Sequence, residues 1–271
     1  MPYTVINGVK KYYEVVGEGE PLFLLNGAFM STESWIMQTR VLSKRYKVCL
    51  QDFRGQWRSG KPERLEDYGV DKDARDLKDL MDKLGIEKAS LVGTSYGGAV
   101  ALYFASTYPD RVKCLVTVNT TARIDCSLKL KIMRWMNGAL TGDPLKFTLS
   151  WINDVYSDEF LNKYGWGFIE NIIKRFSAGF DFKSAAMLLE ATLRLEKENM
   201  LEHLKTIEAP TLVVASDNDR VMPPYFSVEI NNAIKNSELV VLENASHGVV
   251  IEKPDLINTL ILGFLARVIQ R

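Results

Sequence analysis

A serine between two glycines is the residue of this sequence best suited to nucleophilic chemistry. Ser95 lies in Gly93-Thr94-Ser95-Tyr96-Gly97, between an apolar run that ends at Val92 and a helical pattern that begins near Gly97. Small residues on both sides permit a tight turn between a strand and a helix, which exposes the serine at the end of the strand. A serine hydroxyl attacks a carbonyl well only when a base accepts its proton. The motif therefore predicts covalent catalysis and requires a histidine.

The chain contains two histidines, in different contexts. His203 stands at helical spacing in a polar stretch that is typical of a protein surface. His247 lies in Asn244-Ala245-Ser246-His247-Gly248, a loop of small residues that follows the apolar run 239–242. Loops beyond strand ends are where α/β proteins place functional groups. We therefore expect His247 to be the base.

The third group of such a site is a carboxylate that accepts a hydrogen bond from the imidazole and fixes its tautomer. Two candidates, Asp217 and Asp219, follow the apolar run 211–215. We expect Asp219 to be this acid and keep Asp217 as the alternative. Ser95, Asp219 and His247 would then form a Ser-His-Asp triad.

The elements that must position these residues follow an α/β pattern. Short β-rich runs alternate with helical patterns through the first 120 residues, which predicts a mostly parallel sheet flanked by helices. Asn7-Gly8 predicts a hairpin, so that the sheet begins with an antiparallel edge. The expected strands are residues 3–6, 11–16, 22–25, 47–50, 89–92 and 112–118, followed later by 211–215 and 238–242.

A helical stretch interrupts this pattern between Thr121 and Lys205. We expect residues 1–121 and 206–271 to form an α/β core and residues 122–205 to form a helical cap. Together, the aromatic residues of the cap favour the roof of an apolar pocket, although any single ring could instead attach the cap to the sheet. These residues are Trp135, Phe147, Trp151, Trp166, Phe168, Phe176, Phe180 and Phe182.

These motifs resemble those of α/β-hydrolase-fold proteins of the capped esterase and haloperoxidase-like type, along nearly the whole chain. The order Ser95, Asp219, His247 is the order of that class. Asp52-Phe53-Arg54-Gly55 with Ser59 resembles a family stretch, Asp-x-Arg-Gly-x-Gly-x-Ser, that is structural in most members. The resemblance implies this fold, and it assigns no chemical role to Asp52 or Arg54.

Two positions depart from the family pattern. The family usually carries His-Gly where this sequence has Leu25-Asn26-Gly27-Ala28-Phe29. Because an oxyanion hole uses backbone N–H groups, Ala28 and Tyr96 can supply it whatever their side chains are. Asn26 either holds this loop or faces the substrate. Trp57 replaces a glycine of the family stretch and either lines a pocket or contacts the cap. The residues expected to contact substrate are Asn26, Phe29, Trp57, Trp135 and Trp151.

The leading functional hypothesis is hydrolysis of a carboxylic ester or thioester with a hydrophobic part, through an acyl-enzyme and without a metal or organic cofactor. The alternative is an acyltransferase, or a lyase or cofactor-free peroxidase, on the same fold. The stretch from Leu25 to Ala28 with Ser31 to Trp35 resembles a loop of acyltransferases of rhamnolipid-precursor synthesis. A ligand receptor that retains the triad is a further alternative, because fold alone does not establish function.

The charge balance of the chain favours a small-molecule partner. Lys plus Arg and Asp plus Glu both number 34, so there is no field of one sign to attract nucleic acid or an anionic membrane. The amino terminus has no signal-peptide pattern, and we expect a cytoplasmic protein. Cys49, Cys114 and Cys126 lack disulfide or zinc spacing, and each is expected to be buried.

Overall fold

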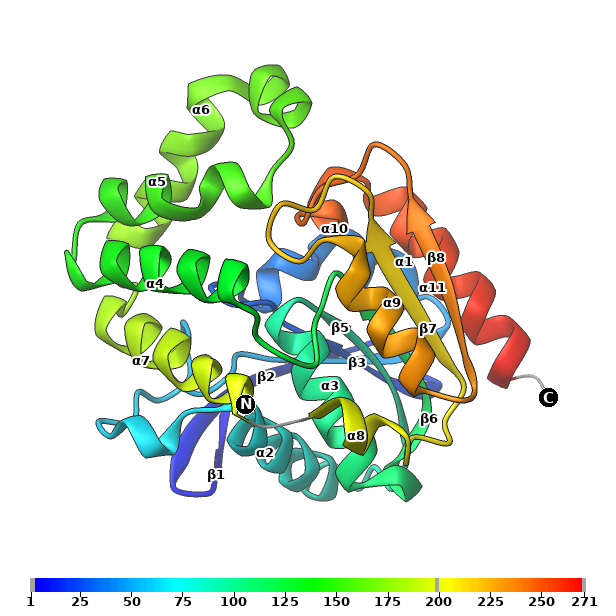
Figure 1. Ribbon diagram of the computed structural model, residues 1–271. Coiled ribbons are helices and arrows are strands. Elements are labelled where there is room, and N and C mark those ends of the chain that lie inside the picture. The colour runs from blue at the N-terminus through cyan, green and yellow to red at the C-terminus, as the bar shows by residue number, and fades with distance from the viewer. Residues whose placement is uncertain (1–2, 198–199, 270–271) are drawn as a thin grey trace.

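An eight-stranded sheet forms the centre of the described part of the chain, with strand order β1-β2-β4-β3-β5-β6-β7-β8. The computed structural model describes residues 3–197 and 200–269 (Figure 1). Residues 1–2, 198–199 and 270–271, which the expected domain ranges include, lie outside the described residues. The strands are β1 (Tyr3–Ile6), β2 (Val9–Val16), β3 (Glu20–Leu25), β4 (Tyr46–Gln51), β5 (Ala89–Thr94), β6 (Val112–Val118), β7 (Thr211–Ser216) and β8 (Ser237–Leu242).

The sheet is antiparallel at one edge and parallel elsewhere. β1 and β2 form the expected hairpin, in which Asn7 and Gly8 adopt φ angles of 49° and 76°. Two successive positive φ angles are characteristic of the hairpin turn that asparagine-glycine favours. β2 also pairs antiparallel with β4, and all later pairs are parallel. The parallel strands therefore bring their carboxyl ends to one edge of the sheet.

Helices cover both faces of the sheet, because successive residues of each central strand point to opposite faces and both sets are apolar. Leu91 and Leu115 point to one apolar cluster, whereas the adjacent Val92 and Val116 point to the other. Because a buried parallel strand has two apolar faces, such strands are continuous runs of hydrophobic residues. The first cluster packs under α2 (Val70–Lys83), α3 (Tyr96–Thr107) and α9 (Pro224–Ala233); the second packs under α1 (Ile36–Leu42) and α11 (Pro254–Ile269). The short helix α10 (Val249–Glu252) precedes α11.

Between β6 and β7, the described residues form only helices and the segments that join them. The helices are α4 (Cys126–Leu140), α5 (Pro144–Val155), α6 (Asp158–Ser177), α7 (Phe182–Thr192) and α8 (Met200–Leu204). Figure 1 shows α4 to α7 as a separate layer beside the edge of the sheet, with α5 and α6 farthest from it. The expectation for Cys126 is wrong: it is exposed at the start of α4, where a small side chain needs no apolar partner, whereas Cys49 and Cys114 are buried.

No helix in the described part of the chain is long and apolar enough to cross a bilayer.

Candidate active site

Ser95 lies in a strained turn between β5 and α3. Its φ and ψ angles are 52° and −124°, a backbone conformation that residues other than glycine rarely adopt. The turn needs both flanking glycines. A Cβ at Gly93 would lie 2.3 Å from the Gly97 carbonyl oxygen, and a Cβ at Gly97 would lie 2.3 Å from the Leu25 carbonyl oxygen. The glycines therefore let three backbone segments meet at the serine.

A continuous hydrogen-bonded chain joins the three residues singled out by the sequence. His247 Nε2 lies 2.9 Å from Ser95 Oγ, and His247 Nδ1 lies 2.7 Å from Asp219 Oδ2. An ionised carboxylate only accepts hydrogen bonds, so Nδ1 carries the ring proton and Nε2 is left as the acceptor. All three side chains come from loops at the carboxyl ends of parallel strands. In this tautomer Nε2 can accept the proton of the serine hydroxyl.

The two candidate carboxylates have different roles in the structure. Asp219 is buried, and its Oδ1 accepts the backbone N–H groups of Val221 and Met222 at 2.8 Å each. This leaves Oδ2 for the imidazole. Asp217 is exposed and accepts the backbone N–H groups of Asn244 and Ala245 instead. Asp219, not Asp217, is the hydrogen-bond partner of His247.

Asn119 connects the loops that carry Asp219 and His247. It follows β6 with a φ angle of 48°, and its buried amide donates to Ser216 Oγ at 2.9 Å, the Ser246 carbonyl at 2.9 Å and the His247 carbonyl at 3.1 Å. Asparagine tolerates this left-handed backbone better than most residues. Sequence reasoning missed Asn119, whose signal was only an asparagine directly after a strand.

Ala28 and Tyr96, the residues expected to donate backbone N–H groups to an oxyanion, lie next to Ser95, in the loop after β3 and at the start of α3. A Cβ at Gly27 would lie 3.3 Å from Ser95 Cβ, which brings the neighbouring Ala28 next to the serine. Tyr96 is the first residue of α3, and the first N–H groups of a helix have no acceptor within it. An oxyanion hole formed by the Ala28 and Tyr96 N–H groups stays a prediction.

Tyr96 is held in place by a buried polar cluster between α2 and β2. Its hydroxyl donates to Asp73 Oδ2 at 2.8 Å. Burial raises the pKa of Asp73 to about 6, against the opposing charge of Lys11. Nearby, Asp76 accepts two hydrogen bonds from Arg54, at 2.6 and 2.9 Å, and one from Lys11 at 3.2 Å. Arg54 is thus structural, as the family resemblance implied.

A mostly apolar cavity of about 330 Å³ opens above Ser95. Of the expected contact residues, Phe29, Trp57, Trp135 and Trp151 line it, together with Ala28, Ser95 and His247. Phe168 and Phe176 also line it, whereas Phe147, Phe180 and Phe182 are packed in the aromatic cluster behind it. The expectation for Trp166 is wrong: this ring is 54% exposed, beside a break in α6 at Gly165, and does not line the cavity.

Asn26 does not face the cavity. Its fully buried amide donates to the Gln51 carbonyl at 3.0 Å and accepts the Trp35 indole N–H at 3.0 Å. The expected substrate contact is therefore wrong for Asn26, and the alternative, that it holds the loop, agrees with these bonds. The amide thus connects the end of β3 to the end of β4 and to Trp35.

Trp57 both lines the cavity and contacts α6, so it fulfils both expected alternatives, a pocket residue and a contact to the helices between β6 and β7. Its indole N–H donates to the Phe29 carbonyl at 2.8 Å, and its ring stacks on Phe176 with centroids 5.8 Å apart. The φ angle of Trp57 is 40°, which explains in physical terms why glycine suits this position in the related sequences.

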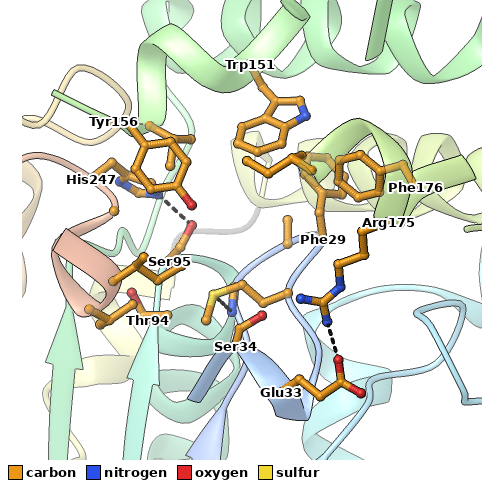
Figure 2. Close-up of a pocket in the computed structure, with 18 of the residues that line it drawn as sticks. Phe29, Glu33, Ser34, Thr94, Ser95, Trp151, Tyr156, Arg175, Phe176 and His247 are labelled. Carbon is orange, nitrogen blue, oxygen red and sulfur yellow. Dashed lines mark hydrogen bonds and ion pairs between the residues drawn. The ribbon is translucent and has the colours of Figure 1, made fainter. Parts of the chain in front are cut away.

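Tyr156, which directly follows α5, and Arg175 of α6 are among the polar cavity residues that were missed from the sequence. Figure 2 shows Arg175 at the side of the cavity, paired with Glu33 at 3.1 Å. Its guanidinium also lies 4.6 Å from the centroid of the Trp57 ring. Neither residue carried a sequence signal, because both stand in ordinary helical patterns. His203, by contrast, is exposed on α8, as expected.

Within residues 3–197 and 200–269, no group of three or more His, Cys, Asp or Glu side chains is arranged to hold a metal ion.

Comparison with known proteins agrees with this architecture. Residues 20–254 match the family described as alpha/beta hydrolase fold. A 2-hydroxy-6-oxononadienedioate/2-hydroxy-6-oxononatrienedioate hydrolase of Comamonas testosteroni is 31% identical, over 92% of this chain and 89% of its own. Among solved structures, MGS-M2, an alpha/beta hydrolase enzyme from a Medee basin deep-sea metagenome library, is 30% identical with a TM-score of 0.90, covering 97% of this chain and 96% of its own. The enol-lactonase of Burkholderia xenovorans LB400 is 25% identical with a TM-score of 0.87, covering 97% and 99%.

Proposed function

The chain belongs to the α/β-hydrolase-fold family, and from this premise we propose that it is a serine hydrolase that cleaves a carboxylic ester or thioester with a hydrophobic part. The observation that carries the proposal is the unbroken chain from Asp219 through His247 to Ser95 at an apolar cavity. Two of the similar proteins described above, the Comamonas testosteroni hydrolase and the enol-lactonase, are hydrolases by name, which supports the reaction class. The substrate is a small molecule.

The proposed mechanism begins with acyl transfer to the enzyme. His247 accepts the Ser95 proton as Oγ attacks the substrate carbonyl, and Asp219 stabilises the imidazolium that forms. The N–H groups of Ala28 and Tyr96 hold the tetrahedral oxyanion. The imidazolium then gives its proton to the leaving oxygen or sulfur as the bond to the carbonyl carbon breaks.

Water completes the cycle. His247 takes a proton from water, whose oxygen attacks the acyl-enzyme carbonyl, and returns the proton to Ser95 Oγ as the acid leaves. The aromatic and aliphatic walls of the cavity exclude other water and bind the apolar part of the substrate. In this proposal residues 122–205 act as a cap over the core, because Trp135, Trp151 and Phe176 of its helices complete these walls.

Hydrolysis of p-nitrophenyl esters of increasing acyl length by the wild type and by Ser95→Ala tests the proposal. We expect the wild type to release p-nitrophenol and the variant to lose about 10³-fold or more in kcat. Equal turnover by the two proteins would contradict a serine mechanism. Adding small alcohols to the same assay separates hydrolysis from acyl transfer, because a transferase would form new esters in preference to the free acid.

A further inference from the structure

Tyr156 presents a hydroxyl group to the cavity on the side of His247. The residue is buried, with 6% of its surface exposed, and it lines the cavity. Figure 2 shows its ring beside His247, with the hydroxyl turned toward Ser95. An aromatic residue that only filled space here would need no hydroxyl, and this hydroxyl has no hydrogen-bond partner among the described residues.

The backbone around Tyr156 is fixed to the loop that carries His247. The Val155 carbonyl accepts both Ser246 Oγ at 2.9 Å and the Gly248 N–H at 2.8 Å. On the other side, the Ser157 N–H donates to Glu252 at 2.7 Å. Hydrogen bonds on both sides of Tyr156 thus connect the end of α5 to the core.

The ring of Tyr156 is also held directly against the histidine loop. A Cβ at Gly248 would lie 2.8 Å from Tyr156 Cε1, so the ring covers the glycine that follows His247. Any side chain at Gly248 would displace the ring. Tyr156 therefore has a defined position relative to the loop that carries His247.

The chemistry of the proposed reaction identifies which substrate atom lies next to His247 and Tyr156. His247 must protonate the leaving-group oxygen, so this oxygen lies within hydrogen-bond distance of Nε2 when the tetrahedral intermediate collapses. The oxyanion lies on the other side of Ser95, toward the Ala28 and Tyr96 N–H groups. A donor next to His247 therefore meets the leaving-group oxygen rather than the oxyanion.

We propose that Tyr156 is a further catalytic residue, whose hydroxyl donates a hydrogen bond to the leaving-group oxygen of an oxygen ester while His247 supplies the proton. The proposal rests on the serine-hydrolase function above. The carbon–oxygen bond breaks, its electron pair stays on the leaving oxygen, and the imidazolium proton neutralises that oxygen. Tyr156 keeps its own proton throughout. Burial raises the pKa of this hydroxyl well above its ordinary value, which keeps it a donor at neutral pH.

The dependence of the rate on the leaving group tests this role. Butanoate esters of p-nitrophenol, phenol and ethanol present the same acyl group with leaving groups of decreasing acidity. Tyr156→Phe should lower kcat/KM for ethyl butanoate by about 10-fold, because the alkoxide oxygen carries the most negative charge and gains most from a charge-assisted hydrogen bond. The loss for p-nitrophenyl butanoate should be about twofold or less, since p-nitrophenolate needs little stabilisation.

Matched measurements separate the possible outcomes. Tyr164→Phe is the matched control, because Tyr164 is half-exposed, packs on Phe160 as Tyr156 does, and does not line the cavity. This variant should change none of the three rates. Equal losses on all three esters would mean that Tyr156 only shapes the pocket, and no loss would mean that its hydroxyl is unused; either result overturns the proposal. If the wild type hydrolyses none of the esters, the proposed function itself fails.

Discussion

Replacing Asp219 by asparagine should abolish catalysis while leaving the fold intact. The two oxygens of Asp219 have separate partners: Oδ1 accepts the Val221 and Met222 N–H groups, and Oδ2 accepts His247 Nδ1. The amide oxygen of asparagine can keep the first set. Its NH₂ group must then face Nδ1, and a donor there favours the tautomer that carries its proton on Nε2. In that tautomer His247 can no longer accept the Ser95 proton.

The expected loss in kcat is about 10⁴-fold, which corresponds to roughly 5 kcal/mol of transition-state stabilisation. The assay is p-nitrophenyl ester hydrolysis, with the free energy of unfolding measured in urea on the same samples. Asp219→Asn should change that free energy by only about 1 kcal/mol, because the backbone hydrogen bonds remain. Asp217→Asn is the matched control and should retain near wild-type kcat. A small effect at Asp219, or a large one at Asp217, would refute the assignment of the acid.

Two further predictions concern stability. Asp76→Asn should lower the free energy of unfolding by about 3 kcal/mol, measured in urea, because it leaves Arg54 and Lys11 buried with one carboxylate fewer. Burial raises the pKa of Asp76, but Lys11 and Arg54 outweigh it and hold that pKa below its ordinary value of 3.8. The stabilisation is therefore complete above pH 3.8 and is lost below it, so the difference between the two proteins should shrink in acid; a constant difference would contradict this reasoning. Asn26→Ala should cost about 2 kcal/mol by leaving the Trp35 indole N–H unpaired, with little change in KM for p-nitrophenyl esters. A stable variant with a raised KM would instead indicate substrate contact.

The sequence predicted the parts of the site that depend on chain order and local pattern. The Ser95 turn required glycines at fixed spacing, and the structure shows backbone contacts at both. Asp219 and His247 could be placed because each follows an apolar strand. The sequence left Asp217 open as an alternative to Asp219, and the hydrogen bonds distinguish the two.

The remaining parts depend on contacts between segments far apart in the chain. Tyr156 lies next to His247 because carbonyl and hydroxyl groups join the end of α5 to the loop after β8. Asn26 carried no sign of its burial, since its partner Trp35 is reached only after the chain turns back. Trp166 fitted an aromatic pattern, but the break at Gly165 leaves it exposed. The local sequence pattern does not show such contacts between distant segments or such breaks in a helix.

The activation of Ser95 is the central claim, and covalent labelling tests it most directly. A fluorophosphonate reacts with a serine whose hydroxyl is activated by a base, and mass mapping of the labelled protein identifies the modified residue. We predict modification at Ser95 in the wild type and its loss in His247→Ala. Labelling at another serine, or no labelling of the folded wild-type protein, would contradict the account.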